Sequence, residues 1–92
     1  MQIKFMGHLK NIVGCEYVSM ENVNGLTLRE VLVRLHDSLG ETSKEIFNGS
    51  PVKVRSSIII LVNDAVYDVV GGLDYVVSED DEIVFLPTVH GG

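Results

Sequence analysis

The chain ends in Pro87-Thr88-Val89-His90-Gly91-Gly92, and these residues have the clearest potential for chemistry. The two glycines carry the terminal carboxylate on backbone without side chains, so they can enter a channel that excludes any Cβ atom. Six extended residues reach roughly 20 Å, at about 3.3–3.6 Å each. This reach can place the carboxylate of Gly92 in the active site of another protein. The alternative is an ordinary frayed chain end that is Gly-Gly by chance.

Two other groups of residues suggest chemistry less strongly. Glu79-Asp80-Asp81-Glu82 offers four carboxylates, but neighbours in a turn point in different directions, and neither a His nor a spaced Asp pattern accompanies them. We therefore expect a solvated turn and no metal site. Cys15 is the single cysteine, which excludes an intramolecular disulfide and a Cys-only metal cluster. A lone thiol of this kind is more typical of a small core residue than of a nucleophile.

Composition and charge exclude further classes of function. Seven Lys and Arg against 13 Asp and Glu give a net charge of −6. Direct binding to nucleic acid is not expected, because affinity for the phosphate backbone comes mainly from cationic side chains. An acidic surface suits a basic protein partner, or it only maintains solubility. The longest apolar run, residues 58–62, is too short to span a membrane, and the first residues lack a secretory signal pattern, so we expect a cytoplasmic protein.

Apolar patterning predicts the strands that position the chain end. Apolar and polar residues alternate over residues 2–5 and 15–20, as in a strand with one buried face. Residues 57–62 contain a continuous apolar run, which is typical of a strand buried on both faces. The predicted strands cover residues 2–5, 15–20, 57–62, 66–70 and 83–86. The first two are joined by a loop, residues 8–14, and are expected to pair antiparallel. Pro87 has a fixed φ and no N–H, so we expect it to end the last strand and direct the tail outward.

The clearest local signature is a helix that begins after Thr27. Thr27 and Glu30 have the spacing of a capping box. Apolar side chains then recur on one helical face, at Leu28, Val31, Leu32, Leu35 and Leu39. Gly40 is expected to end the helix. Ile46 and Phe47 are then expected to anchor a short helical turn.

The order of these elements is strand, strand, helix, turn and three further strands. This order predicts an α+β fold in which a mixed sheet of four or five strands curls around one main helix. A chain of 92 residues has the size of a single domain. We divide it into a folded domain, residues 1–86, and a flexible Gly-Gly tail, residues 87–92.

Several segments resemble a known family. They are Ile60-Leu61-Val62-Asn63-Asp64-Ala65, Gly72-Leu73-Asp74-Tyr75, Ile83-Val84-Phe85-Leu86 and Thr88-Val89-His90-Gly91-Gly92, in that order and spacing. The chain thus resembles the β-grasp sulfur carriers and ubiquitin-like modifiers. These include the ubiquitin-related modifier of tRNA thiolation, the small subunit of molybdopterin synthase (MoaD) and the thiamine sulfur carrier ThiS. The resemblance implies that residues 1–86 form a ubiquitin-like β-grasp domain.

The chain combines features of two members of this family. The segments above look most like the ubiquitin-related modifier. Pro87 after Phe85-Leu86, and the segment from Met1-Gln2-Ile3-Lys4-Phe5 to Val13-Gly14, look like the molybdopterin-synthase subunit. Both tRNA thiolation and molybdopterin synthesis therefore stay open as the destination of the sulfur.

The resemblance implies a carrier that has no catalytic residue of its own and binds no cofactor. A ubiquitin-activating-type adenylyltransferase would use ATP to adenylate Gly92, and a sulfurtransferase would convert it to a thiocarboxylate for a downstream sulfur-accepting enzyme. The activating enzyme would recognise the tail residues Thr88, Val89, His90 and Gly91. For His90 we favour recognition over acid–base catalysis, because a tail residue has no fixed geometry until it is bound.

Two other functions remain open. Gly92 could form an isopeptide bond with a lysine of a target protein, in addition to sulfur transfer or instead of it, or the chain could be an inert β-grasp interaction module. A tail that enters an enzyme also needs its base docked, so we expect exposed apolar residues on the sheet near the tail. The candidates are Leu73, Phe85 and Val89, and the alternative for Phe85 is a place in the core.

Overall fold

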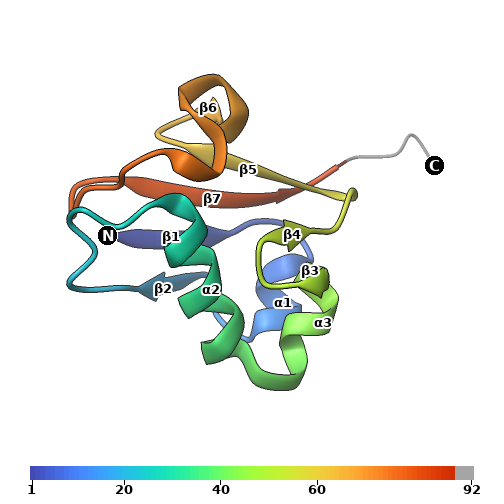
Figure 1. The fold of residues 1–92 in the computed structure, drawn as a ribbon. Helices are drawn as coiled ribbons and strands as arrows, with labels where there is room; N and C mark the ends of the chain where they lie inside the picture. The colour runs from blue at the N-terminus through green and yellow to red at the C-terminus, as the bar shows by residue number, and fades with distance from the viewer. Residues whose placement is uncertain (89–92) are drawn as a thin grey trace.

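The computed structural model describes residues 1–88, and within them a mixed five-stranded sheet carries α2 across one face (Figure 1). The strands are β1 (Gln2–Phe5), β2 (Tyr17–Ser19), β5 (Ile58–Val62), β6 (Ala65–Val66) and β7 (Glu82–Pro87). They lie in the order β2-β1-β7-β5-β6. The central pair, β1 and β7, is parallel, and the other pairs are antiparallel. The predicted α+β fold, with its mixed sheet around one main helix, is confirmed.

The core lies between α2 (Leu28–Leu39) and the inner face of the sheet. Because side chains alternate between the faces of a strand, every second residue of β1, β5 and β7 points toward α2. The buried residues are Leu28, Val31, Leu32 and Leu35 from the helix, and Ile3, Phe5, Ile58, Ile60, Val62, Ile83 and Phe85 from the strands. The rings of Phe5 and Phe85 lie 5.3 Å apart between centroids.

The ends of α2 follow the sequence prediction. The Oγ1 atom of Thr27 accepts a hydrogen bond from the N–H of Glu30 at 3.3 Å, and Glu30 Oε1 accepts one from the N–H of Thr27 at 3.1 Å. This capping box satisfies backbone donors that have no partner inside the helix. At the other end Gly40 has φ +58°, a value that L side chains rarely adopt.

The segment after α2 forms a short helix and a separate hairpin. A 3-10 turn, η1 (Gly40–Thr42), leads to α3 (Ser43–Ile46), where Ile46 and Phe47 are buried as predicted. The strands β3 (Phe47–Ser50) and β4 (Lys53–Val54) then pair antiparallel outside the main sheet. This hairpin lies next to α3, outside the main sheet (Figure 1).

Two predicted segments are wrong. The predicted loop at residues 8–14 contains α1 (Leu9–Val13), because Leu9 at the start of this turn is buried in the core. Of the strand predicted over residues 66–70, only Val66 pairs with β5, as the last residue of β6. The rest forms the 3-10 helix η2 (Tyr67–Val70), which turns Tyr67 and Val70 back onto the core, and η3 (Gly72–Asp74) follows.

Two further predictions need correction on burial and length. The strand β5 is not buried on both faces, because its residues alternate between buried and half-buried. The second strand is shorter than expected and covers Tyr17–Ser19. Cys15 lies before this strand and is exposed, so it is not a core residue.

The acidic turn before β7 is not simply solvated, because Asp81 is only 8% exposed. Its carboxylate accepts hydrogen bonds from Asn63 Nδ2 at 2.8 Å, the Tyr75 hydroxyl at 2.8 Å and the Ser78 N–H at 2.9 Å. Burial disfavours the charged form, but these donors together outweigh it and hold the pKa of Asp81 below its usual value. The buried carboxylate joins the turn after β5 to the start of β7.

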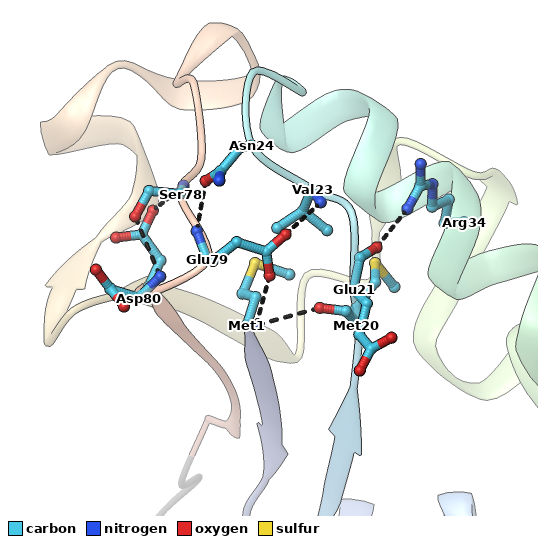
Figure 2. A network of polar contacts seen from close by, with 10 residues as sticks. Met1, Met20, Glu21, Val23, Asn24, Arg34, Ser78, Glu79 and Asp80 are labelled. Atoms are coloured by element: carbon cyan, nitrogen blue, oxygen red, sulfur yellow. Dashed lines mark hydrogen bonds and ion pairs between the residues drawn. The ribbon is translucent and has the colours of Figure 1, made fainter.

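Glu79, two residues earlier, ties the same turn to the start of the chain and to the segment between β2 and α2 (Figure 2). Its carboxylate accepts a hydrogen bond from the N–H of Val23 at 2.8 Å and lies 3.4 Å from the amino group of Met1. The same amino group donates to the carbonyl of Met20 at 3.1 Å. The Val23 N–H, followed by the nearby amino group, lowers the pKa of Glu79 despite some desolvation. The turn before β7 is therefore held by two sets of contacts, those of Asp81 with Asn63 and Tyr75 and those of Glu79 with Val23 and Met1.

Candidate functional site

The base of the tail is held by the sheet. Pro87 lies opposite Ile58 as the last residue of β7, one residue later than predicted. The N–H of Thr88 then donates to the carbonyl of Ser57 at 2.8 Å, and the Thr88 hydroxyl donates to the same oxygen at 3.2 Å. The tail thus leaves the domain from a fixed point, next to the first residue of β5.

The position of Pro87 has a simple geometric reason. Peptide groups alternate in direction along a strand, and the N–H of Thr88 points toward β5. The nitrogen of Pro87 therefore faces the β1 side, where β1 ends at Phe5 and Met6 donates a last hydrogen bond to the carbonyl of Phe85. The missing N–H of Pro87 thus falls at the end of the ladder between β1 and β7, where no further strand pairing follows. Gly7 passes close by with φ +58°, and a Cβ atom on it would lie 3.0 Å from Pro87 Cγ.

Part of the predicted reactive segment lies outside the described residues. Val89, His90, Gly91 and Gly92 belong to this part, and only Thr88 of the predicted recognition residues is described. The roles assigned to these five residues, and the division of the chain into residues 1–86 and a flexible tail, stay predictions.

The outer face of the sheet, opposite α2, presents a row of side chains across all five strands. Strand register aligns Tyr17, Lys4, Val84, Leu61 and Val66 in that order. Val84 in the centre is 5% exposed, whereas Tyr17 and Val66 at the ends are 43% and 44% exposed. The Nζ atom of Lys4 lies 5.6 Å from the centre of the Tyr17 ring, a cation–π distance.

A second set of apolar side chains connects this row to the tail. Ile59 and Leu86 lie opposite each other in β5 and β7, and both are half-buried. Met6 continues the pairing of β1 by donating its N–H to the carbonyl of Phe85 at 3.0 Å, and it is 38% exposed. We call the apolar residues of the row and of this set the outer sheet face: Met6, Tyr17, Ile59, Leu61, Val66, Val84 and Leu86. An exposed apolar surface of this kind, next to the anchored tail, is typical of a docking site.

The predicted docking residues lie elsewhere. Phe85 is completely buried, because odd-numbered residues of β7 point toward α2, so its assignment to an exposed docking surface is wrong. Leu73 is half-buried in η3 and packs against the core, away from the outer sheet face. Val84 and Leu86 flank Phe85 in β7 and lie on the outer side of the strand instead. The alternation of β7 would have identified them once Phe85 was assigned to the core.

Other kinds of site find little support in the described part of the chain. Within residues 1–88, no group of three or more His, Cys, Asp or Glu side chains is arranged to hold a metal ion. None of the helices described in this range is long and apolar enough to cross a membrane.

Comparison with known proteins identifies the family of this chain. Residues 1–92, the whole chain, match the family model described as Urm1 (Ubiquitin related modifier). The chain belongs to the ubiquitin-related modifier family. It is 32% identical over 75 residues to the ubiquitin-related modifier 1 homolog of Dictyostelium discoideum, covering 82% of this chain and 77% of that protein. The homolog of Drosophila willistoni is 35% identical over 75 residues, with coverages of 82% and 74%.

Solved structures of this family and related proteins share the fold. The solution structure of small archaeal modifier protein 1 from Methanosarcina acetivorans is 25% identical with a TM-score of 0.79, covering 99% of this chain and 94% of that one. The ubiquitin-related modifier of Trypanosoma brucei gives 25% identity, a TM-score of 0.79 and coverages of 99% and 93%. CysO from Mycobacterium tuberculosis is 26% identical with a TM-score of 0.72, covering 96% of this chain and 98% of that one. The β-grasp fold is confirmed, and this family member is a ubiquitin-like carrier or modifier.

Proposed function

We propose that this protein is a sulfur carrier whose terminal carboxylate, on Gly92, is activated by adenylation and converted to a thiocarboxylate. The observation that carries the proposal is the outer sheet face, which runs from the exposed Val66 to Leu86 beside the anchored base of the tail. A ubiquitin-activating-type adenylyltransferase would hold this face and receive the tail. Membership of the ubiquitin-related modifier family supports the same reaction class.

The chemistry requires an activated carboxylate, because a carboxylate is a poor electrophile at neutral pH. Attack of the Gly92 carboxylate on the α-phosphorus of ATP forms an acyl-adenylate and releases pyrophosphate. A persulfide of a sulfurtransferase then attacks the acyl carbon and displaces AMP, and a second thiol cleaves the resulting acyl disulfide to leave the thiocarboxylate. This chain contributes no acid, base or metal ligand to these steps. It positions the reacting carboxylate, because Thr88 anchors the base of the tail next to the outer sheet face that the enzyme would hold.

The destination of the sulfur is a downstream enzyme of tRNA thiolation or of molybdopterin synthesis. Family membership favours tRNA thiolation, since the whole chain matches the ubiquitin-related modifier model. The same acyl-adenylate or thiocarboxylate can also acylate a lysine of a target protein, so conjugation is the second proposed outcome. A cytoplasmic setting stays a prediction from the sequence.

Mass spectrometry of the protein from its native cells distinguishes these outcomes. Replacement of one oxygen of Gly92 by sulfur increases the mass of the C-terminal peptide by the difference between the two atoms and marks the carrier. A Gly-Gly remnant on lysines of other proteins marks the modifier. Absence of both products would favour the inert interaction module.

Deletion of Gly92 tests the activation step directly. The deletion shortens the reach of the tail by about 3.5 Å, far more than a near-attack geometry tolerates. We expect loss of ATP–pyrophosphate exchange by the cognate activating enzyme. The melting temperature should stay unchanged, because the described core is built from residues between Ile3 and Phe85. Retained exchange would contradict both the carrier and the modifier proposals.

A further inference from the structure

A small pocket lies on the helix side of the sheet, away from the outer sheet face. It has a volume of about 270 Å³ and lies between β4 and the 3-10 helices η2 and η3. Its floor is apolar and combines Leu32 from α2, Ile58 and Ile60 from β5, and Leu73 from η3. Ile58 and Ile60 point toward α2, whereas Ile59 between them belongs to the outer sheet face. The two surfaces therefore lie on opposite sides of β5.

The charged side chains that line this pocket are both cationic. They are Lys53 and Arg55, and both residues are exposed. Within residues 1–88, neither takes part in an ion pair. The Nε atom of Arg55 donates to the carbonyl of Lys44 at 2.7 Å, so the guanidinium is held in place while its charge is not neutralised by a described carboxylate. This local positive charge stands out in a protein with a net charge of −6.

We propose that this pocket binds an acidic peptide segment of a partner protein. One apolar side chain of the segment would fill the floor, and flanking carboxylates would pair with Lys53 and Arg55. The planar guanidinium suits a carboxylate, because it donates two parallel hydrogen bonds. The pocket lies just below the range of about 300–1,000 Å³ that is typical of small-molecule sites, so a single side chain fits it better than a cofactor.

The pocket differs from the outer sheet face in the partner that it selects. The outer sheet face is apolar, and the overall negative charge of the protein favours basic partners. The pocket combines an apolar floor with positive charge and therefore favours an acidic partner. Because the two surfaces lie on opposite sides of β5, a protein in the pocket would leave the outer sheet face accessible. This inference does not depend on the chemistry proposed for Gly92.

A titration of the isotopically labelled full-length protein, followed by NMR, tests the proposal. The probe is the capped peptide acetyl-Glu-Asp-Leu-Asp-Glu-amide. We expect saturable shifts of the backbone amides of Val54, Ser56 and Tyr67, which line the pocket, with a Kd on the order of 1 mM. Amides of the outer sheet face, such as those of Leu61 and Val84, should not shift. Absence of saturable shifts at the pocket, or shifts confined to the outer sheet face, would overturn the proposal.

Charge reversals and altered probes separate the pocket from general electrostatics. Lys53→Glu should weaken binding by about tenfold, because it replaces attraction by repulsion beside the apolar floor. Lys10→Glu changes the net charge equally on α1, outside the pocket, and should change affinity by less than about twofold. Replacing the leucine of the probe by glycine should also abolish saturation. Equal losses for both variants, or full competition by inorganic phosphate, would reduce the site to nonspecific anion binding and overturn the proposal.

Discussion

At the level of single residues, Asp81 shows how a buried charge can organise a turn. Its two carboxylate oxygens accept three hydrogen bonds, from Asn63, Tyr75 and Ser78. The hydrogen bond to the Asp81 carboxylate also raises the pKa of the Tyr75 hydroxyl, because ionised tyrosine could no longer donate it. Asn63 in turn accepts a hydrogen bond from the N–H of Glu82 at 3.0 Å, at the first residue of β7. The network thus sets where the strand that carries the tail begins.

Replacing Asp81 by Asn should reduce the free energy of unfolding at neutral pH by about 1–3 kcal/mol. Both carboxylate oxygens of Asp81 accept hydrogen bonds, and in Asn one of them becomes an NH₂ group that cannot accept. The folded pKa of Asp81 is lower than its ordinary value of 3.8. Its stabilising contribution is therefore complete above pH 3.8 and is lost as the pH falls through the lower folded pKa. Urea denaturation at pH 7 and at successively lower pH measures this difference between wild type and variant.

The neighbouring Asp80 provides the control. Asp80 is exposed, and its side chain makes no hydrogen bond or ion pair within residues 1–88. Asp80→Asn removes the same charge and should change stability by less than about 0.5 kcal/mol. Equal effects of the two substitutions would show that the loss of charge, rather than the hydrogen-bond network, determines the stability of the turn.

At the level of elements, β7 connects the core to the functional surface. Its residues Ile83 and Phe85 pack against α2, while Val84 and Leu86 face outward, and the strand continues to Pro87. It pairs with β1 on one side and with β5 on the other. The rigidity of the tail base therefore depends on the packing of α2 against the inner face.

The packing of α2 can be tested by truncation. Leu32→Ala and Leu35→Ala should each lower the free energy of unfolding by about 2–5 kcal/mol, because both side chains are completely buried. Val33 lies on the same helix and is 36% exposed, so Val33→Ala should change the free energy of unfolding by less than about 0.5 kcal/mol. Chemical denaturation monitored by circular dichroism measures all three. An unchanged midpoint for both leucine variants would contradict the position of the helix over the sheet.

At the level of the whole molecule, the outer sheet face and the basic pocket occupy separate positions. The outer sheet face and the pocket lie on opposite sides of β5, and the tail leaves beside its first residue. This arrangement allows one partner to hold the sheet and receive the tail while a second partner binds the pocket.

A matched pair of exposed valines tests the role of the outer sheet face. Val66, on β6, is 44% exposed on this face, and Val33, on α2, is 36% exposed away from it. Val66→Glu should weaken binding to the activating enzyme by about tenfold or more, because it places a charge in an apolar interface. Val33→Glu should have little effect. The KM of the protein in the ATP–pyrophosphate exchange assay measures the difference, and equal values for the two variants would place the docking surface elsewhere.

Local sequence patterns determined much of this protein. The capping box of Thr27 and Glu30, the apolar stripe of α2 and the strands predicted at residues 2–5, 57–62 and 83–86 depend on neighbours within a few residues. The structure confirms them, with strand ends that differ by at most one residue. Alternation along β7 also predicts two opposite faces. It does not say which face meets the helix, so it leaves Phe85 equally suited to a docking surface and to the core, and the structure places it in the core.

Only the tertiary structure decided the features that join distant segments. Asp81 is buried because Asn63 and Tyr75 donate to it from other parts of the chain. Likewise, Thr88 is anchored because β5 brings the carbonyl of Ser57 to it. The outer sheet face forms because strand pairing aligns residues from five separate segments. Such features depend on contacts whose partners are far apart in the sequence, so a local pattern supplies the residues but not their partners.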